Sequence, residues 1–340
     1  MNSNILYSIE FLRGLLATTV AICHLYLSQN NNIHLETISS LCVEVFFIIS
    51  GFVLAPQLIK VFNTNNLINF KIFIIRRFLR TLPAYFFFLV IISLLLNNFL
   101  SLNFFKYLFF IQNFFSLNVN IDYYPIAWSL SVEEWFYIIF ISFLFLSRKI
   151  FKSQNIMFCL LAWFLIFFSF KIIYFSFNDL QFGENLRRIT IFRLDTIAIG
   201  SIFFIYKELI YKKLKKISYY SLFLLIPFYL FFISNIQTKN ILLIETLLVF
   251  THLSSLIILY VFINIEKFFL KFKKFSIFYG KISYSIYLSH LIIIILFNNI
   301  FESLSLIILL FYLFIVLVIS TLVRKFIEEI FLNLRPNFKF

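Results

Sequence analysis

The sequence contains few charged residues and few glycines. Only 13% of its 340 residues are Asp, Glu, Lys or Arg, whereas 62% are hydrophobic; soluble domains are about 45–50% apolar. This composition excludes an ordinary soluble domain and predicts a polytopic membrane protein. The five glycines leave little room for a glycine-rich phosphate-binding loop, and the sequence shows neither such a loop nor an internal repeat.

Cysteine is equally scarce. The three cysteines, Cys23, Cys42 and Cys159, show no spacing typical of a metal or redox site. Cys42 is expected near the outer end of its helix and Cys159 near the cytoplasmic end, so we expect no structural disulfide. Arg13 interrupts the first apolar run and no convincing small-residue cleavage site is found, so we expect no cleavable signal peptide.

Apolar segments long enough to cross a bilayer occur along the whole chain. Segments of about 17–25 residues span a hydrocarbon core of ~30 Å. We therefore predict an all-α polytopic membrane protein with about ten transmembrane helices, which forms one transmembrane domain over residues 1–340 without a soluble domain. The predicted spans are residues 6–27, 41–60, 78–98, 131–147, 156–177, 189–206, 218–234, 241–264, 282–300 and 304–325.

The basic residues predict the orientation of these helices. The formal net charge is +14, but the Lys and Arg residues punctuate apolar spans, so we expect contacts with lipid headgroups and no nucleic-acid partner. Of the 29 Lys and Arg residues, only Lys106, Arg187, Arg188 and Lys239 fall in loops opposite the amino terminus. The positive-inside rule then predicts an even number of spans with both termini cytoplasmic.

Two ionisable residues lie inside the first apolar segment. Arg13 and His24 are eleven positions apart, which is about three helical turns plus 20°, so both project from one face roughly 16 Å apart along the axis. Ionisable residues at bilayer depth indicate a functional site, because each costs about 2.5–3.5 kcal/mol unless it is paired or wetted. The alternative is a snorkelling arginine and a structural histidine bonded to a backbone carbonyl.

Short polar motifs mark the second and third spans. Ser50-Gly51-Phe52 contains a glycine that permits close approach of a neighbouring helix or a ligand; helix packing alone is the simpler explanation. Arg77 and Arg80 are three positions apart and share a helix face. Their planar guanidinium groups suit the phosphates of a cytoplasmic cofactor, although a charge cluster that sets orientation is the commoner explanation.

A carboxylate marks the fourth span. Glu133 and Tyr137, at i and i+4, share a helix face close to Trp128, whereas Glu134 is turned about 100° away. Glu133 is therefore the better candidate for an inward-facing carboxylate. In the sixth span Arg193 and Asp195 interrupt an apolar run, for which a local ion pair is the alternative to a functional role.

The ninth span begins with another polar stripe. Ser283, Tyr287 and His290 recur at helical spacing, so they form a polar line along an otherwise apolar helix.

Together these motifs resemble the acyltransferase-3 family of integral-membrane O-acyltransferases over nearly the whole chain. The matching motifs are Arg13/His24, Ser50-Gly51-Phe52, Arg77/Arg80, Trp128-Ser129-Leu130…Glu133…Phe136-Tyr137, Arg193…Asp195, and Gly280…Ser283-Tyr284…Tyr287-Leu288…His290. Two features depart from the family pattern. The extra extracytoplasmic hydrolase-like domain of some relatives is missing, so the chain resembles the stand-alone O-antigen and exopolysaccharide O-acetyltransferases. Glu328-Glu329-Ile330-Phe331 lacks the proline that often follows the acidic residue, so this segment is left out of the site.

The resemblance implies transfer of an acyl group, most often acetyl from cytoplasmic acetyl-CoA, to a hydroxyl of a lipid-linked or cell-surface glycan in the bacterial inner membrane, without a metal. A sugar hydroxyl needs a base to remove its proton, and histidine suits this role. We assign His24 as the base, Glu133 as the group that orients it, and Arg13 to the cofactor or the oxyanion. Arg77 and Arg80 would bind CoA phosphates. Direct transfer and a transient acyl-enzyme both remain open, as does the oligomeric state.

Two other functions are compatible with the same residues. Buried Arg, His and Glu side chains also form proton relays and substrate pathways in transporters and flippases, although the sequence shows neither inverted repeats nor matching broken helices. An O-acyltransferase that acts on a peptide, a lipid or a small metabolite is the third reading. CoA release from acetyl-CoA by the purified protein distinguishes an enzyme from a transporter.

Overall fold

The regular elements of the computed structural model are helices. The structure describes residues 6–64, 66–115, 123–150, 155–177, 186–214, 223–235, 238–301 and 303–339. Every regular element in these ranges is helical, which confirms the all-α prediction. The short elements between and after the long helices are α4 (Leu102–Leu108), η1 (Leu186–Arg188), η2 (Thr190–Phe192), α10 (Glu266–Phe269), η4 (Leu270–Phe272), η5 (Arg324–Glu328) and α13 (Glu329–Asn333).

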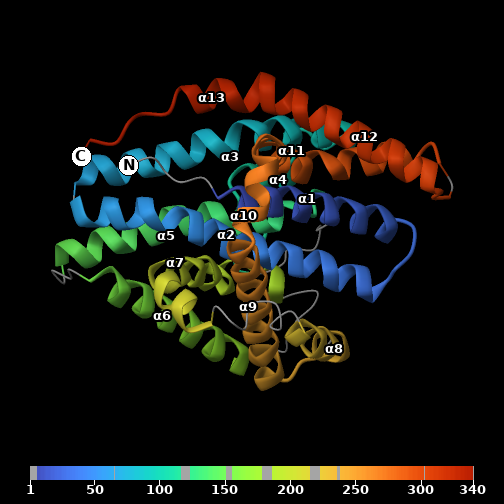
Figure 1. Cartoon of the computed structure of the whole chain (residues 1–340). Helices are drawn as coiled ribbons and strands as arrows, with labels where there is room; N and C mark the ends of the chain where they lie inside the picture. The colour runs from blue at the N-terminus through green and yellow to red at the C-terminus, as the bar shows by residue number, and fades with distance from the viewer. Residues whose placement is uncertain are drawn as a thin grey trace. The chain divides into compact units, whose positions relative to one another are not determined.

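The ten longer helices each overlap one of the predicted apolar segments (Figure 1). They are α1 (Tyr7–Leu27), α2 (Ile33–Thr64), α3 (Leu67–Leu95), α5 (Ala127–Ile150), α6 (Ile156–Phe177), α7 (Leu194–Leu214), α8 (Leu225–Asn235), α9 (Ile241–Asn264), α11 (Lys273–Asn298) and α12 (Leu306–Val323). Among the described residues, eight helices are long and apolar enough to cross a membrane. The protein is therefore a polytopic membrane protein.

Helices α7 and α8 are the two that differ from the predicted spans. Asp195, Lys207 and Glu208 make α7 more polar than the other long helices. Helix α8 has 11 described residues, and residues 218–222 of the predicted span lie outside the described ranges. The cytoplasmic position of both termini and the single-domain organisation remain predictions.

The helices α2 and α3 begin earlier than the apolar pattern predicts. Asn66 precedes α3, and its side chain accepts a hydrogen bond from the backbone N–H of Ile68 (2.9 Å). In the same way Asn32 accepts from the N–H of His34 (2.9 Å) at the start of α2. Polar side chains that bond the first N–H groups of a helix fix where it starts. Arg77 therefore lies well inside α3 and does not open it.

The chain forms two compact units. The first comprises Met1–Phe46, Leu209–Ser234 and Phe250–Glu329; the second comprises Phe47–Glu208, Asn235–Val249 and Ile330–Phe340.

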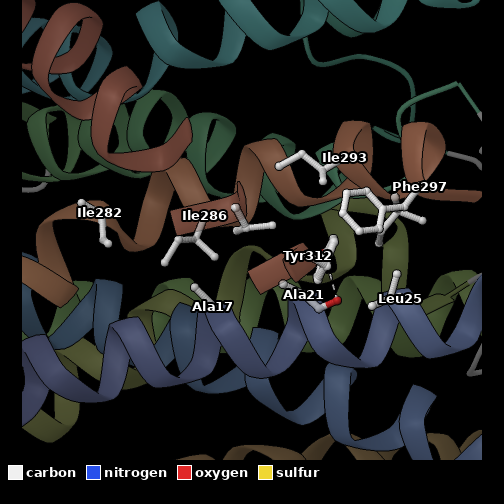
Figure 2. Close-up of a cluster of buried hydrophobic side chains, with 10 residues drawn as sticks. Ala17, Ala21, Leu25, Ile282, Ile286, Ile293, Phe297 and Tyr312 are labelled. Carbon is white, nitrogen blue, oxygen red and sulfur yellow. Dashed lines mark hydrogen bonds between the residues drawn. The ribbon is translucent and has the colours of Figure 1, made fainter. Parts of the chain in front are cut away.

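In the first unit, α1 packs along α11, and α11 packs on α12. Figure 2 shows the apolar side chains between these helices, with Ala17 and Ala21 of α1 facing the isoleucines of α11. Small side chains at i and i+4 let two helices approach closely. At Gly14 the approach is closer still, because an added Cβ would lie 2.3 Å from Cγ of Tyr279. This packing fixes which faces of α1 and α11 meet.

A glutamate holds the beginning of α1. The carboxylate of Glu266, in α10, accepts hydrogen bonds from the backbone N–H groups of Tyr7 and Ser8 (both 2.9 Å) and from the hydroxyl of Ser8 (2.6 Å). The first N–H groups of a helix have no partner within the helix, and a negative charge at this end is favourable. Glu266 thus anchors the amino-terminal end of α1 within the first unit.

In the second unit, α2 and α7 cross at two glycines. A Cβ added to Gly51 would lie 1.8 Å from the carbonyl oxygen of Ile197, and a Cβ added to Gly200 would lie 2.0 Å from that of Ile48. The hydroxyl of Ser201 donates to the carbonyl of Gly51 (2.9 Å). The two backbones therefore touch, as in other membrane helix pairs with small residues at the contact.

Helix α12 shows a face that suits lipid. Leu306, Ile307, Leu310 and Phe314 are 58–79% exposed. Such a row of exposed apolar side chains is unfavourable in water but ordinary against acyl chains. The membrane-lipid contacts expected from the sequence are consistent with this face.

Candidate functional site

Arg13 is paired on its own helix. Its Nη1 lies 3.3 Å from Oε2 of Glu10, and the two side chains are 14% and 22% exposed. Glu10 also packs against α11, because an added Cβ at Gly280 would lie 2.2 Å from its Oε2. Glu10 is not among the predicted site residues, although an acid three positions before a base is a recognised helix pair. Arg13 therefore keeps a counter-charge within the first unit.

His24 and His290 form a hydrogen-bonded pair in the first unit. Nδ1 of His24, on α1, lies 2.9 Å from Nε2 of His290, on α11, and the ring centroids are 5.2 Å apart. His290 is fully buried, whereas His24 is half-buried. Two of the histidines singled out in the sequence thus meet across the α1–α11 contact, which the sequence did not predict.

The remaining residues of the α11 stripe have different surroundings. The Tyr287 ring lies 5.8 Å from the His290 ring and 6.3 Å from the Phe46 ring, measured between centroids. The hydroxyl of Ser283 donates to the carbonyl of Gly280 in its own helix (2.8 Å). Tyr287 therefore lines the histidine pair, whereas the hydroxyl hydrogen of Ser283 is used in its own helix.

Glu133 is the centre of a hydrogen-bonded group in the second unit. Its Oε1 accepts from the hydroxyl of Ser50 on α2 (2.8 Å), and its Oε2 accepts from the hydroxyl of Tyr137 one turn along α5 (3.1 Å). The structure thus brings together three of the predicted site residues. Glu134 is also buried, at 2% exposure, beside Thr81 and Arg77. Glu134, which helical spacing ranked below Glu133 as the inward-facing carboxylate, is the more deeply buried of the two.

Arg77 is buried, whereas Arg80 is half-buried. Nη2 of Arg77 donates to Oε1 of Gln57 on α2, and the guanidinium lies over the Phe73 ring (5.2 Å). Its buried Nε has no hydrogen-bond partner among the described residues. A buried guanidinium with an unused N–H is suited to an anionic group of a ligand. The neighbouring Arg76 is used differently, since it donates to the carbonyl of Pro336 (2.7 Å).

Asp195 pairs with Lys171, which is not among the predicted site residues. Nζ of Lys171, on α6, lies 2.7 Å from Oδ2 of Asp195, and the two side chains are 2% and 1% exposed. Arg193 is also fully buried, and Glu245 of α9 is an electrostatic neighbour of this group. Lys171 interrupts an apolar span, and an ionisable residue in such a position was itself the available signal.

The other predicted residues of the second unit take part in packing. Trp128 lies under the guanidinium of Arg187 (5.5 Å) and against Phe47 (ring centroids 5.9 Å apart). Phe52 packs against Phe203 and Phe204 (6.0 and 5.3 Å). Together with the crossing at Gly51, these contacts support the structural reading of the Ser50-Gly51-Phe52 motif, with Ser50 as its polar member.

The two units thus present two kinds of chemistry. The histidine pair of the first unit can take and hold a proton. The second unit holds carboxylates and guanidinium groups that can bind charged parts of a ligand. Among the described residues, no group of three or more His, Cys, Asp and Glu side chains is arranged to hold a metal ion.

Comparison with known proteins agrees with this description. A family model described as an acyltransferase domain matches residues 6–325. The chain is 28% identical over 167 residues to the peptidoglycan O-acetyltransferase OatA of Listeria monocytogenes, covering 44% of this chain and 26% of OatA. It is 27% identical over 185 residues to an uncharacterized protein of Haemophilus influenzae, covering 49% of this chain and 75% of that protein. No solved structure matches the chain.

The similarity to OatA covers less than half of this chain and about a quarter of that relative, so it gives the family and not the substrate. The family model, by contrast, covers nearly all of the described helices. Both of these relatives are bacterial proteins, and OatA carries the name of an O-acetyltransferase. The protein therefore belongs to the acyltransferase-3 family of membrane O-acyltransferases.

Proposed function

We propose that the protein transfers an acetyl group from cytoplasmic acetyl-CoA to a hydroxyl of a cell-envelope glycan, acting in the bacterial inner membrane. The observation that carries this proposal is the hydrogen bond between His24 and His290, in a chain matched by an acyltransferase family over residues 6–325. The name of the relative OatA, a peptidoglycan O-acetyltransferase, supports a glycan as the acceptor.

The reaction requires a base, because a neutral sugar hydroxyl is a poor nucleophile. The hydroxyl oxygen attacks the thioester carbonyl, and the imidazole of His24 takes the hydroxyl proton as the C–O bond forms. When the tetrahedral intermediate collapses, the C–S bond breaks and the CoA sulfur leaves as a thiolate, which receives the proton held by the His24 imidazolium, so that the base is regenerated. General-base catalysis of this kind contributes about 10²–10⁴-fold to a rate.

The charged residues divide the remaining tasks. Arg77 and Arg80 bind phosphates of CoA, since the buried Arg77 has an N–H without a hydrogen-bond partner among the described residues. Arg13 binds the donor or the developing oxyanion, with Glu10 as its resting partner. Glu133, held by Ser50 and Tyr137, contributes a carboxylate in a fixed orientation within the second unit.

The test is acetyl transfer by the purified full chain in nanodiscs. We expect acetyl-CoA to yield free CoA only when a glycan acceptor is present, and mass spectrometry of surface glycans to show an acetyl ester that is lost without the gene. His24→Ala should abolish the transfer and leave insertion intact. The matched control is His34→Ala, which removes an exposed histidine that bonds Tyr229. Near-normal product from a well-folded His24→Ala protein would remove His24 from the mechanism.

The sidedness of the reaction gives a second test. The helical rise places His24 roughly 16 Å from Arg13 along α1, so we propose that the donor enters from the cytoplasm and the acceptor from the other face. In oriented vesicles, acetyl-CoA on the cytoplasmic face should acetylate an acceptor confined to the opposite compartment. Product that forms only when both substrates share one face contradicts this arrangement.

A further inference from the structure

A catalytic histidine uses one ring nitrogen as the base, and an orienting group is hydrogen-bonded to the other nitrogen. In His24 this second nitrogen is Nδ1, and its partner is His290. In a base–orienter pair, the orienting group holds the far ring nitrogen and so decides which nitrogen can accept a proton. Here Nδ1 of His24 lies 2.9 Å from Nε2 of His290. The position assigned to a carboxylate in the sequence analysis is thus taken, within the first unit, by a second imidazole.

The other nitrogen of His290 determines the tautomer of both rings. Nδ1 of His290 lies 3.2 Å from the backbone carbonyl oxygen of Ile286. A carbonyl oxygen only accepts hydrogen bonds, so Nδ1 of His290 must carry the hydrogen. In the neutral ring Nε2 is then an acceptor, and the hydrogen between the two rings belongs to Nδ1 of His24. Neutral His24 is left with Nε2 as its basic nitrogen.

A third helix, α12, helps to fix the positions of the two histidines. Tyr312, on α12, is fully buried; its hydroxyl donates to the carbonyl of Ala21 (3.2 Å) and lies 3.4 Å from the carbonyl of His290. Figure 2 shows this hydroxyl at Ala21, between α1 and α11. Ala21 is one turn before His24 on α1. The same side chain therefore ties together the two backbones that carry the histidines.

We infer that His290 is the positioning residue of His24. Its Nε2 accepts a hydrogen bond from Nδ1–H of His24 and so fixes the Nδ1–H tautomer of His24. Nε2 of His24 is then the nitrogen that takes the proton of the acceptor hydroxyl. The inference rests on the proposed role of His24 as the base. When Nε2 gains the proton, the imidazolium of His24 keeps its hydrogen bond to His290. The hydrogen bonds from Ile286 through His290 to His24 are thus compatible with both the neutral and the protonated form of His24.

The tautomers can be measured without any substrate. The chain has four histidines, so the full-length protein labelled with ¹⁵N-histidine in nanodiscs gives few imidazole signals, which can be assigned by removing one histidine at a time. We expect His24 and His290 each to have a protonated Nδ1 and an unprotonated Nε2. In His290→Ala, His24 should return toward the Nε2–H tautomer that predominates in water. His24 with a protonated Nε2 in the unaltered protein would overturn the inference.

A second variant controls for the cavity left by His290→Ala. The amide of Gln reaches about as far as Nε2 of His, so His290→Gln places an acceptor oxygen near Nδ1 of His24. We expect His290→Gln to restore part of the Nδ1–H population and part of the activity. His290→Ala should lower kcat at least tenfold with little change in KM for acetyl-CoA. An unchanged His24 tautomer in both folded variants contradicts the positioning role.

The two proposals fail in different ways. If His24→Ala stays active, the proposed base is wrong, whatever the tautomer measurement shows. If His24→Ala is inactive but both His290 variants keep the normal kcat and the normal His24 tautomer, the base stands and the role of His290 is wrong.

Discussion

The polar groups at the histidine pair of the first unit differ in kind from the buried ion pair of the second unit. At the two histidines of the first unit, the hydrogen-bonded groups include neutral ones: the imidazole of His290, the phenol of Tyr312 and backbone carbonyls. The second unit contains a buried ion pair, Lys171–Asp195, and a half-buried carboxylate, Glu133, that is hydrogen-bonded to Ser50. A base must change its charge during each turnover, and neutral neighbours permit this. Paired ions keep a fixed charge for binding or for structure.

The largest expected effect tests the fixed charges of the second unit. Lys171→Met leaves Asp195 without its buried partner, and breaking a buried pair in this way costs about 3–5 kcal/mol. Lys171→Met with Asp195→Asn should recover most of that loss, because no buried charge remains from the pair. The measurement is thermal unfolding in detergent, with Lys239→Met at an exposed site as the control. A single variant as stable as the double one contradicts the pairing.

The next largest expected effect is the loss of stability when alanine replaces a glycine at a helix contact in either unit. Gly51→Ala puts a methyl group 1.8 Å from the backbone oxygen of Ile197, whereas Gly14→Ala meets the Tyr279 ring at 2.3 Å. A side-chain ring can turn aside more easily than a helix backbone can move, so Gly51→Ala should cost more. Overpacking costs about 1–3 kcal/mol. Thermal unfolding of both variants gives the order, and a larger loss at Gly14 would reverse our reading of the two contacts.

The arginines of α3 provide a test of binding. Arg77→Lys with Arg80→Lys keeps the positive charge, and so the expected topology, but loses the planar fork that binds phosphate at two points. We expect KM for acetyl-CoA to rise about tenfold, equivalent to about 1.4 kcal/mol. Arg148→Lys, near the end of α5, is the matched control. An unchanged KM in the double variant would show that the two arginines only set orientation.

The smallest expected effect is a difference in stability between alanine variants of two serines of the predicted site. The hydroxyl of Ser50 donates to Glu133 on another helix, whereas that of Ser283 donates to its own helix. Interhelical hydrogen bonds in membranes contribute about 0.6 kcal/mol on average. Ser50→Ala should therefore lower stability by about this amount, and Ser283→Ala should leave it nearly unchanged. Equal shifts in the unfolding temperature would remove the distinction.

The sequence was sufficient for features that depend on local pattern. Hydropathy located the helices, and helical spacing singled out His24 and His290 separately. Their pairing could not be predicted from the sequence, because the two histidines are 266 positions apart and meet only through the packing of α1 on α11. The starts of α2 and α3 were misplaced because Asn32 and Asn66 cap the helices outside the apolar runs.

For some contacts the sequence contained a feature that pointed to a partner, and for others it contained none. Lys171 stood out as an ion in an apolar span, yet its partner Asp195 lies on a different helix, 24 positions away. Gln57, the partner of Arg77, is an ordinary polar residue in the sequence. Only the three-dimensional arrangement of α2 and α3 shows what it binds.

The crossing of Gly51 and Gly200 also determines how α2 and α7 respond to their surroundings. Because backbone touches backbone there, the spacing of the two helices at that point does not depend on side-chain rotamers. Bilayers of different thickness change helix tilt. At this crossing the two helices cannot approach further, so we expect a thinner or thicker membrane to change their angle and not to bring them closer.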